Sequence, residues 1–140
     1  MALCIDAVHA CHVRFLVTVS KDPQYLTATQ IEHIKGKTKE EDFCATLDEA
    51  LRIYKKNGFV VTKICADSEF ETLLAPLEDG LDVVLDIAPA GAHVPEIERS
   101  NRTAKERFRA CHHCLPFTVM PKAMIIAMFL DCVCKLNFFP

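Results

Sequence analysis

A helix-forming segment followed by two apolar, strand-like segments is the feature that most limits the fold of this chain. Between residues 39 and 57, apolar side chains recur at helical spacing, and Asn57-Gly58 supplies a C-terminal stop. Segments 59–66 (FVVTKICA) and 81–88 (LDVVLDIA), separated by a short stretch at 70–77, are apolar enough for strands of a largely buried sheet. With a strand before the helix, the order strand, helix and strand implies a parallel crossover.

The N-terminal residues predict antiparallel strands. Segments 2–6 and 13–20 are apolar and β-branched, and a third short strand is expected from Tyr25 to Ala28, after the Asp22-Pro23 turn. These three segments predict an antiparallel meander. Joined to the parallel strands, they predict an α/β domain whose mixed sheet is flanked by helices.

Two more helices are expected near the C-terminus. Pro95 can occupy the first turn of one of them. Its apolar residues are predicted to share one face, and they are Ile97, Ala104, Phe108 and Cys111. Glu98 then lies at the border of that buried stripe. A further helix over 121–135 is apolar nearly all round, so it is either covered within the domain or half of a dimer contact.

Composition favours one folded domain over residues 1–140. Hydrophobic residues make up 51% of the chain, charged residues 25%, and the four glycines offer no linker. There is no signal peptide pattern, so the protein is not expected to be secreted and its eight cysteines are interpreted as reduced. The most apolar run, 123–134, is too short to span a bilayer and contains Asp131, so we expect no membrane segment.

Charge is distributed unevenly along the chain, although the net charge is only −3. Residues 64–98 contain nine acidic residues and no Lys or Arg, whereas 99–109 contain five basic residues and one acid, Glu106. An acidic stretch suited to cations therefore runs directly into a basic stretch suited to phosphate. The alternative interpretation of the basic stretch is a solvated helix face.

Three carboxylates occupy positions that favour a shared site. Asp6 lies in or just after the first strand, Asp67 directly follows strand 59–66, and Glu98 lies in the first turns of a helix. Sites in α/β sheets commonly form at strand ends and helix starts. Carboxylate oxygen is the ligand that Mg²⁺ prefers, and two such ions can stabilise an in-line phosphoryl displacement. Each of the three acids could instead be a helix cap or a surface charge.

Other residues compete for these roles. The nearest alternative acids are Glu69, Glu71 and Glu96, and Glu96 would replace Glu98 if the helix register were shifted. The Cys and His groups at 9–12 (HACH), 111–114 (CHHC) and 132–134 (CVC) suggest zinc. Contiguous residues on a helix splay around its axis, however, and the paired spacings of zinc fingers are missing. The one zinc arrangement left open is a site that combines residues from distant groups. The alternative is that the cysteines are buried in the core and the histidines are exposed.

A specific family resemblance supports Glu98. The segment HVPEIERSNRTAKERFR (93–109), followed by LPF (115–117) and KLNFFP (135–140), resembles copia-type retrotransposon integrases. In that family a catalytic glutamate opens a basic helix, ahead of a leucine-proline and a closing leucine-asparagine-x-x-proline. Glu98 matches this glutamate. ADSEFE (66–71) resembles the family strand that ends in a metal-binding aspartate, which assigns that role to Asp67.

The first strand completes the resemblance. CIDAVHACHVRFLVTVS (4–20) is similar to the family's first strand and hairpin, and Asp6 is the equivalent of its metal-binding aspartate. Two loops depart from the family pattern. Asp-x-Gly-x-Glu-Phe is shortened to residues 67–70, and Gln-Asn-Gly is replaced by residues 93–96. The interval between Asp67 and Glu98 is also shorter than is typical of integrases.

The resemblance implies an RNase-H-like catalytic core of the Asp-Asp-Glu type. It implies two Mg²⁺ or Mn²⁺ ions held by Asp6, Asp67 and Glu98, which would also be the catalytic residues. The implied reaction is DNA 3′-end processing followed by strand transfer into target DNA. A homodimer or higher oligomer acting in the nucleus, after transport with a cytoplasmic particle, is expected. The zinc module and DNA-binding region of a complete integrase are missing here, so a fragment of a polyprotein is suspected.

The basic helix supplies the expected DNA contacts. Arg102 and Lys105 stand four and seven residues beyond Glu98, hence on its face of the helix, and Asn101 can hydrogen-bond near the same site. Arg99 and Arg109 are further candidates. For Arg99, Arg107 and Arg109 the alternative is surface solvation or pairing with Glu106 and nearby acids. The alternative function is a catalytically inactive remnant that binds DNA or dimerises through the basic helix and the apolar 121–135 helix.

Overall fold

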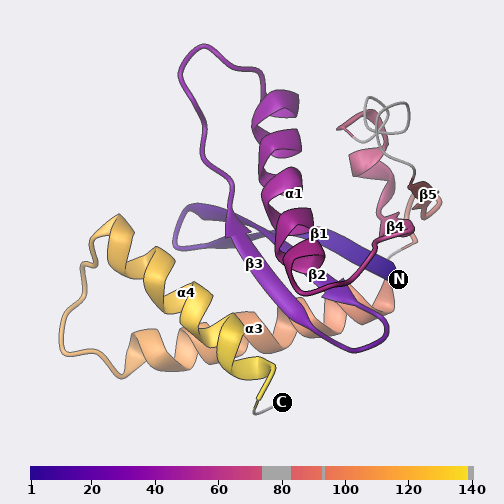
Figure 1. The fold of residues 1–140 in the computed structure, drawn as a ribbon. Coiled ribbons are helices and arrows are strands. Elements are labelled where there is room, and N and C mark those ends of the chain that lie inside the picture. Colours follow the sequence, from indigo (N-terminus) through magenta and orange to yellow (C-terminus); the bar gives the residue numbers. More distant parts are fainter. Residues whose placement is uncertain (74–82, 93, 139–140) are drawn as a thin grey trace.

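The computed structural model describes residues 1–73, 83–92 and 94–138. The strands form one sheet in the order β3-β2-β1-β4-β5, with antiparallel pairing from β3 to β1 and parallel pairing from β1 to β5 (Figure 1). The strands are β1 (Ala2–Ala10), β2 (Val13–Ser20), β3 (Leu26–Gln30), β4 (Lys63–Ala66) and β5 (Val84–Ile87). The predicted α/β fold with a mixed sheet is confirmed.

The first hairpin is longer than predicted. β1 continues four residues beyond the expected end at Asp6, because Val8 and Ala10 extend its alternation of buried side chains. Cys11 and His12 form the turn with φ angles of 45° and 65°, the left-handed conformation of tight two-residue hairpins. Asp6 therefore lies inside a strand, paired with Val17 of β2, and not at a strand end.

The two parallel strands are shorter than predicted. β4 begins only at Lys63, because that residue pairs with Ala2 at the start of β1. The preceding Val60 is 73% exposed, although its side chain is typical of strands. β5 occupies Val84–Ile87, and residues 81–82 of the predicted strand lie outside the described residues. Of the short stretch at 70–77, residues 74–77 also lie outside the described residues.

Helix α1 (Lys39–Lys56) covers one face of the sheet (Figure 1). Its start is fixed by a capping box in which the Thr38 and Glu41 side chains accept each other's backbone N–H, and Asn57 is the C-cap as predicted. The buried core on this face combines residues of the helix, the strands and the turn after β4. These are Leu3, Ile5, Leu16, Phe43, Leu47, Ala50, Tyr54, Ile64, Ala66 and Phe70.

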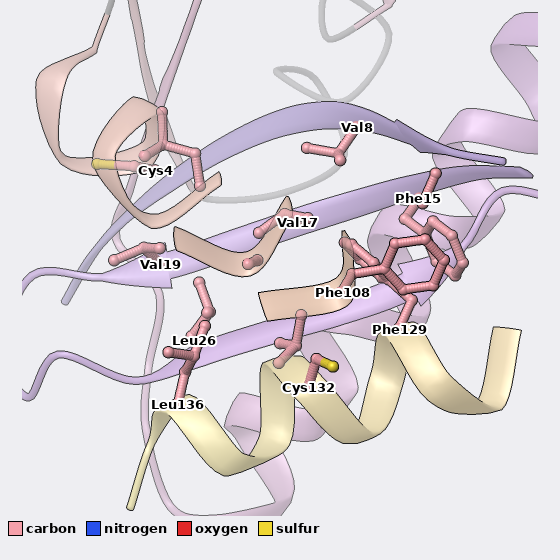
Figure 2. Packing of buried hydrophobic residues seen from close by; sticks show 14 of the residues in the cluster. Cys4, Val8, Phe15, Val17, Val19, Leu26, Phe108, Phe129, Cys132 and Leu136 are labelled. Atoms are coloured by element: carbon pink, nitrogen blue, oxygen red, sulfur yellow. The ribbon is translucent and has the colours of Figure 1, made fainter. Parts of the chain in front are cut away.

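Helices α3 (Pro95–His113) and α4 (Lys122–Leu136) cover the opposite face. Figure 2 shows Phe129 of α4 beside Phe15 of β2 and Phe108 of α3. The ring centroids of Phe15 and Phe129 lie 4.3 Å apart and those of Phe108 and Phe129 lie 5.8 Å apart. The apolar stripe predicted for α3 is correct for Ile97, Ala104 and Phe108, but Cys111 is exposed.

Helix α4 is covered on one side only. Ile125, Phe129 and Leu136 are among its buried residues, whereas Met124 is 37% exposed. Neither α4 nor any other helix within the described ranges combines the length and apolarity that crossing a bilayer requires.

Asn137 anchors the segment after α4 to the start of β3. Its side-chain Oδ1 accepts a hydrogen bond from the Leu26 N–H at 2.7 Å, and its Nδ2 donates to the Leu26 carbonyl at 2.8 Å. One amide side chain thus satisfies both backbone groups of a strand residue, as a neighbouring strand would. The closing leucine-asparagine of the sequence therefore has a structural role.

Candidate metal and nucleic-acid site

Asp6 lies within β1, and Asp67 directly follows β4, the parallel strand that pairs with β1. The last pair that joins β1 to β4 is Cys4 with Cys65. Continuing this register by two residues brings Asp6 beside Asp67, which follows β4 directly. Side chains two residues apart in a strand share a face, and Cys4 and Cys65 both belong to the core beneath α3. The Asp6 side chain is therefore directed to the α3 side of the sheet, and the charge of Asp67 lies near enough to act on it.

The turn after Asp67 is held by aromatic packing. Asp67 is the N-cap of a short 3-10 helix, η1 (Ser68–Phe70), and its carbonyl accepts the Phe70 N–H at 3.0 Å. Phe70 is 1% exposed, and its ring centroid lies 5.3 Å from that of Phe43 on α1. Burial of Phe70 therefore fixes the position at which the chain leaves β4.

Asn101 of α3 reaches across to Asp6. Its Nδ2 donates to Asp6 Oδ2 at 2.6 Å, and the Ala7 N–H donates to Asp6 Oδ1 at 2.7 Å. Asn101 is 5% exposed, and its Oδ1 is buried with no hydrogen-bond partner within the described ranges. A buried acceptor of this kind is costly unless another group binds it. The sequence predicted Asn101 as a DNA-binding residue near Glu98; in the structure its side chain contacts Asp6.

The surroundings of Asp6 disfavour the ionised form of its carboxyl group. Burial is the largest effect that raises its pKa, and the negative charges of Asp67 and Glu69 raise it further, while the hydrogen bonds from Ala7 and Asn101 act in the opposite direction. The net result is a pKa above the usual aspartate value. Half-buried, mutually repelling carboxylates are the environment that a divalent cation stabilises.

Glu69 also contributes negative charge near Asp6. From the sequence, Glu69 was considered only as an alternative to the three chosen acids. The turn η1 brings it back toward Asp6, two residues after Asp67. The sequence contains one signal for the position of Glu69, namely the apolar Phe70 that follows it. Because Phe70 is buried, the chain must turn tightly directly after the strand.

Glu98 and Glu96 face different surroundings in the first turn of α3. The Lys21 ammonium lies 3.4 Å from a Glu96 carboxylate oxygen. The pKa of Glu96 lies below its usual value, first because of a hydrogen bond from its own backbone and then because of the charge of Lys21. Glu96 and Arg99 also line a separate groove of about 580 Å³ between α3 and the start of β3. Glu98 is exposed and stands one helical turn before Asn101, the residue that contacts Asp6.

The donor set fits divalent cations in part. Asp6 and Asp67 offer carboxylate oxygens, and hard cations prefer such oxygens. Within the described part of the chain, however, no three Asp, Glu, His or Cys side chains are gathered closely enough to hold a metal ion. The exposed Glu98 is not preassembled with the two aspartates.

The basic residues of α3 form no ion pairs within the described ranges. Arg102 and Arg109 are exposed and Lys105 is half-buried. None of them is paired with Glu106, the alternative that the sequence left open for Arg109. Helical spacing places Arg102, Lys105 and Arg109 along one side of α3. This side therefore presents positive charge that is available for phosphate.

Of the three Cys and His motifs, CHHC and CVC contact each other through Cys111 and Cys132, whose Sγ atoms lie 4.0 Å apart. HACH spans the end of β1 and the hairpin turn, CHHC ends α3, and CVC lies within α4. Across the described ranges all eight cysteines are free thiols.

Comparison with known proteins identifies the fold. A mixed five-stranded sheet with α1 on one face and α3 and α4 on the other is the RNase-H-like fold of integrase catalytic cores. The chain matches no family model and none of the curated proteins. It is similar to the solved catalytic core domain of BIV integrase, with a TM-score of 0.63 and 15% identity, over 97% of this chain and 82% of that chain.

A second solved structure shows the same fold. It is the simian T-cell lymphotropic virus intasome in complex with PP2A regulatory subunit B56 gamma. The TM-score is 0.65 and the identity is 16%, over 99% of this chain and 49% of that chain. The chain thus spans about half the length of that relative.

Proposed function

We propose that this chain is an integrase catalytic core of a copia-type retrotransposon, a metal-dependent polynucleotidyl transferase that processes DNA 3′ ends and joins them to target DNA. The observation that carries the proposal is the β1–β4 register, which sets Asp6 beside Asp67 under a helix whose Asn101 binds Asp6. The likeness of fold to integrase cores supports it, and so does the motif resemblance around Glu98.

The proposed roles follow from the position of each residue. Asp6 and Asp67 would hold two Mg²⁺ or Mn²⁺ ions, and Glu98 would complete their ligands from the start of α3. When bound, such ions stabilise the negative charge of phosphoryl transfer and provide a reactive oxygen nucleophile. Asn101 would keep the Asp6 carboxylate oriented through its 2.6 Å hydrogen bond. It is a positioning residue and not itself a ligand.

The proposed DNA contact is the positive side of α3. Arg102 and Lys105 follow Glu98 on the same helical face, so a DNA strand end at the carboxylates would pass along them. Arg109 extends this surface, and Arg99 would contribute from the adjoining groove. Contacts of this type act mainly on phosphates, so they would position DNA without reading its sequence. We further propose that the chain works in the nucleus as a homodimer or higher oligomer.

The direct test is cleavage or disintegration of a labelled DNA substrate with Mn²⁺. We expect activity in the unmodified chain and a loss of at least about a hundredfold in Asp67→Asn, because one metal-binding carboxylate is removed. Glu71→Gln removes an exposed acid of the same acidic segment and should retain activity. Equal residual activity in Asp67→Asn and in the unmodified chain would refute the enzyme proposal.

A second candidate function is an inactive remnant that binds DNA or dimerises. The exposed Glu98 favours it, as does the lack of three gathered ligands within the described ranges. The half-covered α4 and the positive side of α3 would then be the functional surfaces. Light scattering combined with Mg²⁺ titration separates the candidates, because a remnant dimerises or binds DNA without binding the cation.

A further inference from the structure

Cys111 of α3 and Cys132 of α4 face each other across the contact between these helices. Their Sγ atoms lie 4.0 Å apart. Each cysteine stands one helical turn beyond a member of the aromatic pair Phe108 and Phe129, whose ring centroids are 5.8 Å apart. Because the aromatic contact fixes how closely α3 and α4 approach, it also holds the two thiols next to each other.

The two thiols differ in their access to solvent. Cys111 is exposed, whereas Cys132 is 5% exposed. Burial, and then the neighbouring Cys111, raise the pKa of the Cys132 thiol to about 11. A reagent in solution therefore meets Cys111 first, and Cys132 is shielded until a neighbouring sulfur becomes its target.

We propose that Cys111 and Cys132 are a thiol pair that forms an intramolecular disulfide with small disulfides such as oxidised glutathione. This goes beyond the proposed DNA chemistry and does not depend on it. Thiol and disulfide sulfurs must approach to about 2.05 Å for a bond, and the observed separation leaves only a side-chain adjustment between helices already in contact.

The reaction has two balanced steps. The Cys111 thiolate, its proton released to solvent, attacks one sulfur of glutathione disulfide, and one glutathione leaves as a thiolate. The Cys132 thiol then loses its proton and attacks the Cys111 sulfur, which expels the second glutathione. The protein loses two protons and two electrons, and one glutathione disulfide takes them up to become two glutathiones.

The new bond would tie α4 to the helix that carries Asn101. It closes the chain between residues 111 and 132, which includes the whole connection between the two helices. Closing a loop of this length restricts the unfolded chain, so we expect the melting midpoint to rise by about 5 °C or more. The gain should disappear on addition of a reductant.

The test uses the reduced 140-residue chain incubated with glutathione disulfide, alkylated, and mapped by mass spectrometry without reduction. We expect a peptide linking Cys111 to Cys132 and the protection of both thiols from alkylation. Cys132→Ala should accumulate a glutathione adduct on Cys111, and Cys111→Ser should leave Cys132 unreacted. Circular dichroism verifies that both variants fold.

Matched controls come from the exposed cysteines of the same helices. Cys114→Ser and Cys134→Ser should leave the 111–132 link unchanged, because neither residue has a thiol contact like that of Cys111 with Cys132 within the described ranges. A lasting glutathione adduct on Cys111 in the unmodified chain would overturn the proposal. A link from Cys111 to Cys114, or one between two molecules, would overturn it as well.

Discussion

The side-chain amide of Asn101 donates a 2.6 Å hydrogen bond to the carboxylate of Asp6, and so joins the buried side of α3 to the centre of β1. Asn101→Ala should lower the free energy of unfolding by about 1–2 kcal/mol, because it removes a hydrogen bond to a charged acceptor. Urea denaturation measures the change. Ser100→Ala, which removes only a hydroxyl bonded to the Glu96 carbonyl, should change stability by less than about 0.5 kcal/mol. Similar losses in both variants would argue against the Asn101 contact.

Asp6 predicts an unusual pH dependence. Burial and the nearby Asp67 and Glu69 raise its folded-state pKa above the unfolded value of about 3.9, so the folded state binds more protons between the two values. Its contribution to stability is therefore greatest below about pH 4 and is lost as the pH rises through the folded pKa. The Asp6→Asn variant lacks this loss of stability with rising pH.

The measurement is the difference in unfolding free energy between the unmodified chain and Asp6→Asn, with chelator present. We expect this difference to shift in favour of the variant as the pH is raised from about 4 to 7. A difference that stays constant over this range would mean that Asp6 has an ordinary pKa in the folded protein.

The two hydrogen bonds between the Asn137 side chain and the Leu26 backbone, here called the Asn137 clamp, stabilise a part of the fold far from the carboxylates. Asn137→Ala removes two hydrogen bonds to the Leu26 backbone and leaves both groups with no side-chain partner. We expect a loss of about 2 kcal/mol in urea denaturation. Asn57→Ala, where the side chain bonds one exposed carbonyl, should cost less than about 1 kcal/mol. If the two variants were equally stable, the clamp would have no energetic role.

The positive side of α3 predicts how DNA affinity depends on salt. Arg102→Ala and Lys105→Ala should each lower the slope of log affinity against log salt by about 1, because each removes one phosphate contact. Fluorescence anisotropy with labelled DNA measures the slope. Arg52→Ala removes an exposed arginine of α1, on the other face of the sheet, and should leave the slope unchanged. An unchanged slope in Arg102→Ala and Lys105→Ala would place DNA elsewhere.

Local patterns in the sequence predicted most elements of the fold. The capped helix 39–57 and the Pro95 start of α3 depend on neighbouring residues, and both were confirmed. The ends of strands were less predictable, because they depend on partners distant in the chain. Val60 has the side chain of a strand residue, yet pairing of β4 with β1 begins only at Lys63. Asp6 lies inside its strand for the same reason, since β2 pairs with β1 as far as Ala10.

The candidate site was predictable only through the family motifs. Composition offers 19 acidic residues, and spacing alone does not select among them. The β1–β4 register that sets Asp6 beside Asp67 is a tertiary property, and so is the approach of Glu69. The contact between Cys111 and Cys132 was equally hidden, because Cys111 was assigned to the buried stripe of its helix when it is exposed at the helix contact.

Binding of Mn²⁺ measured by calorimetry tests the central claim most directly, namely that Asp6 and Asp67 form a cation site beside α3. We expect saturable binding in the unmodified chain and binding weakened at least about tenfold in Asp6→Asn and in Asp67→Asn, with Glu71→Gln unaffected. Equal Mn²⁺ binding by the unmodified chain and both aspartate variants, or none in the unmodified chain, would contradict it.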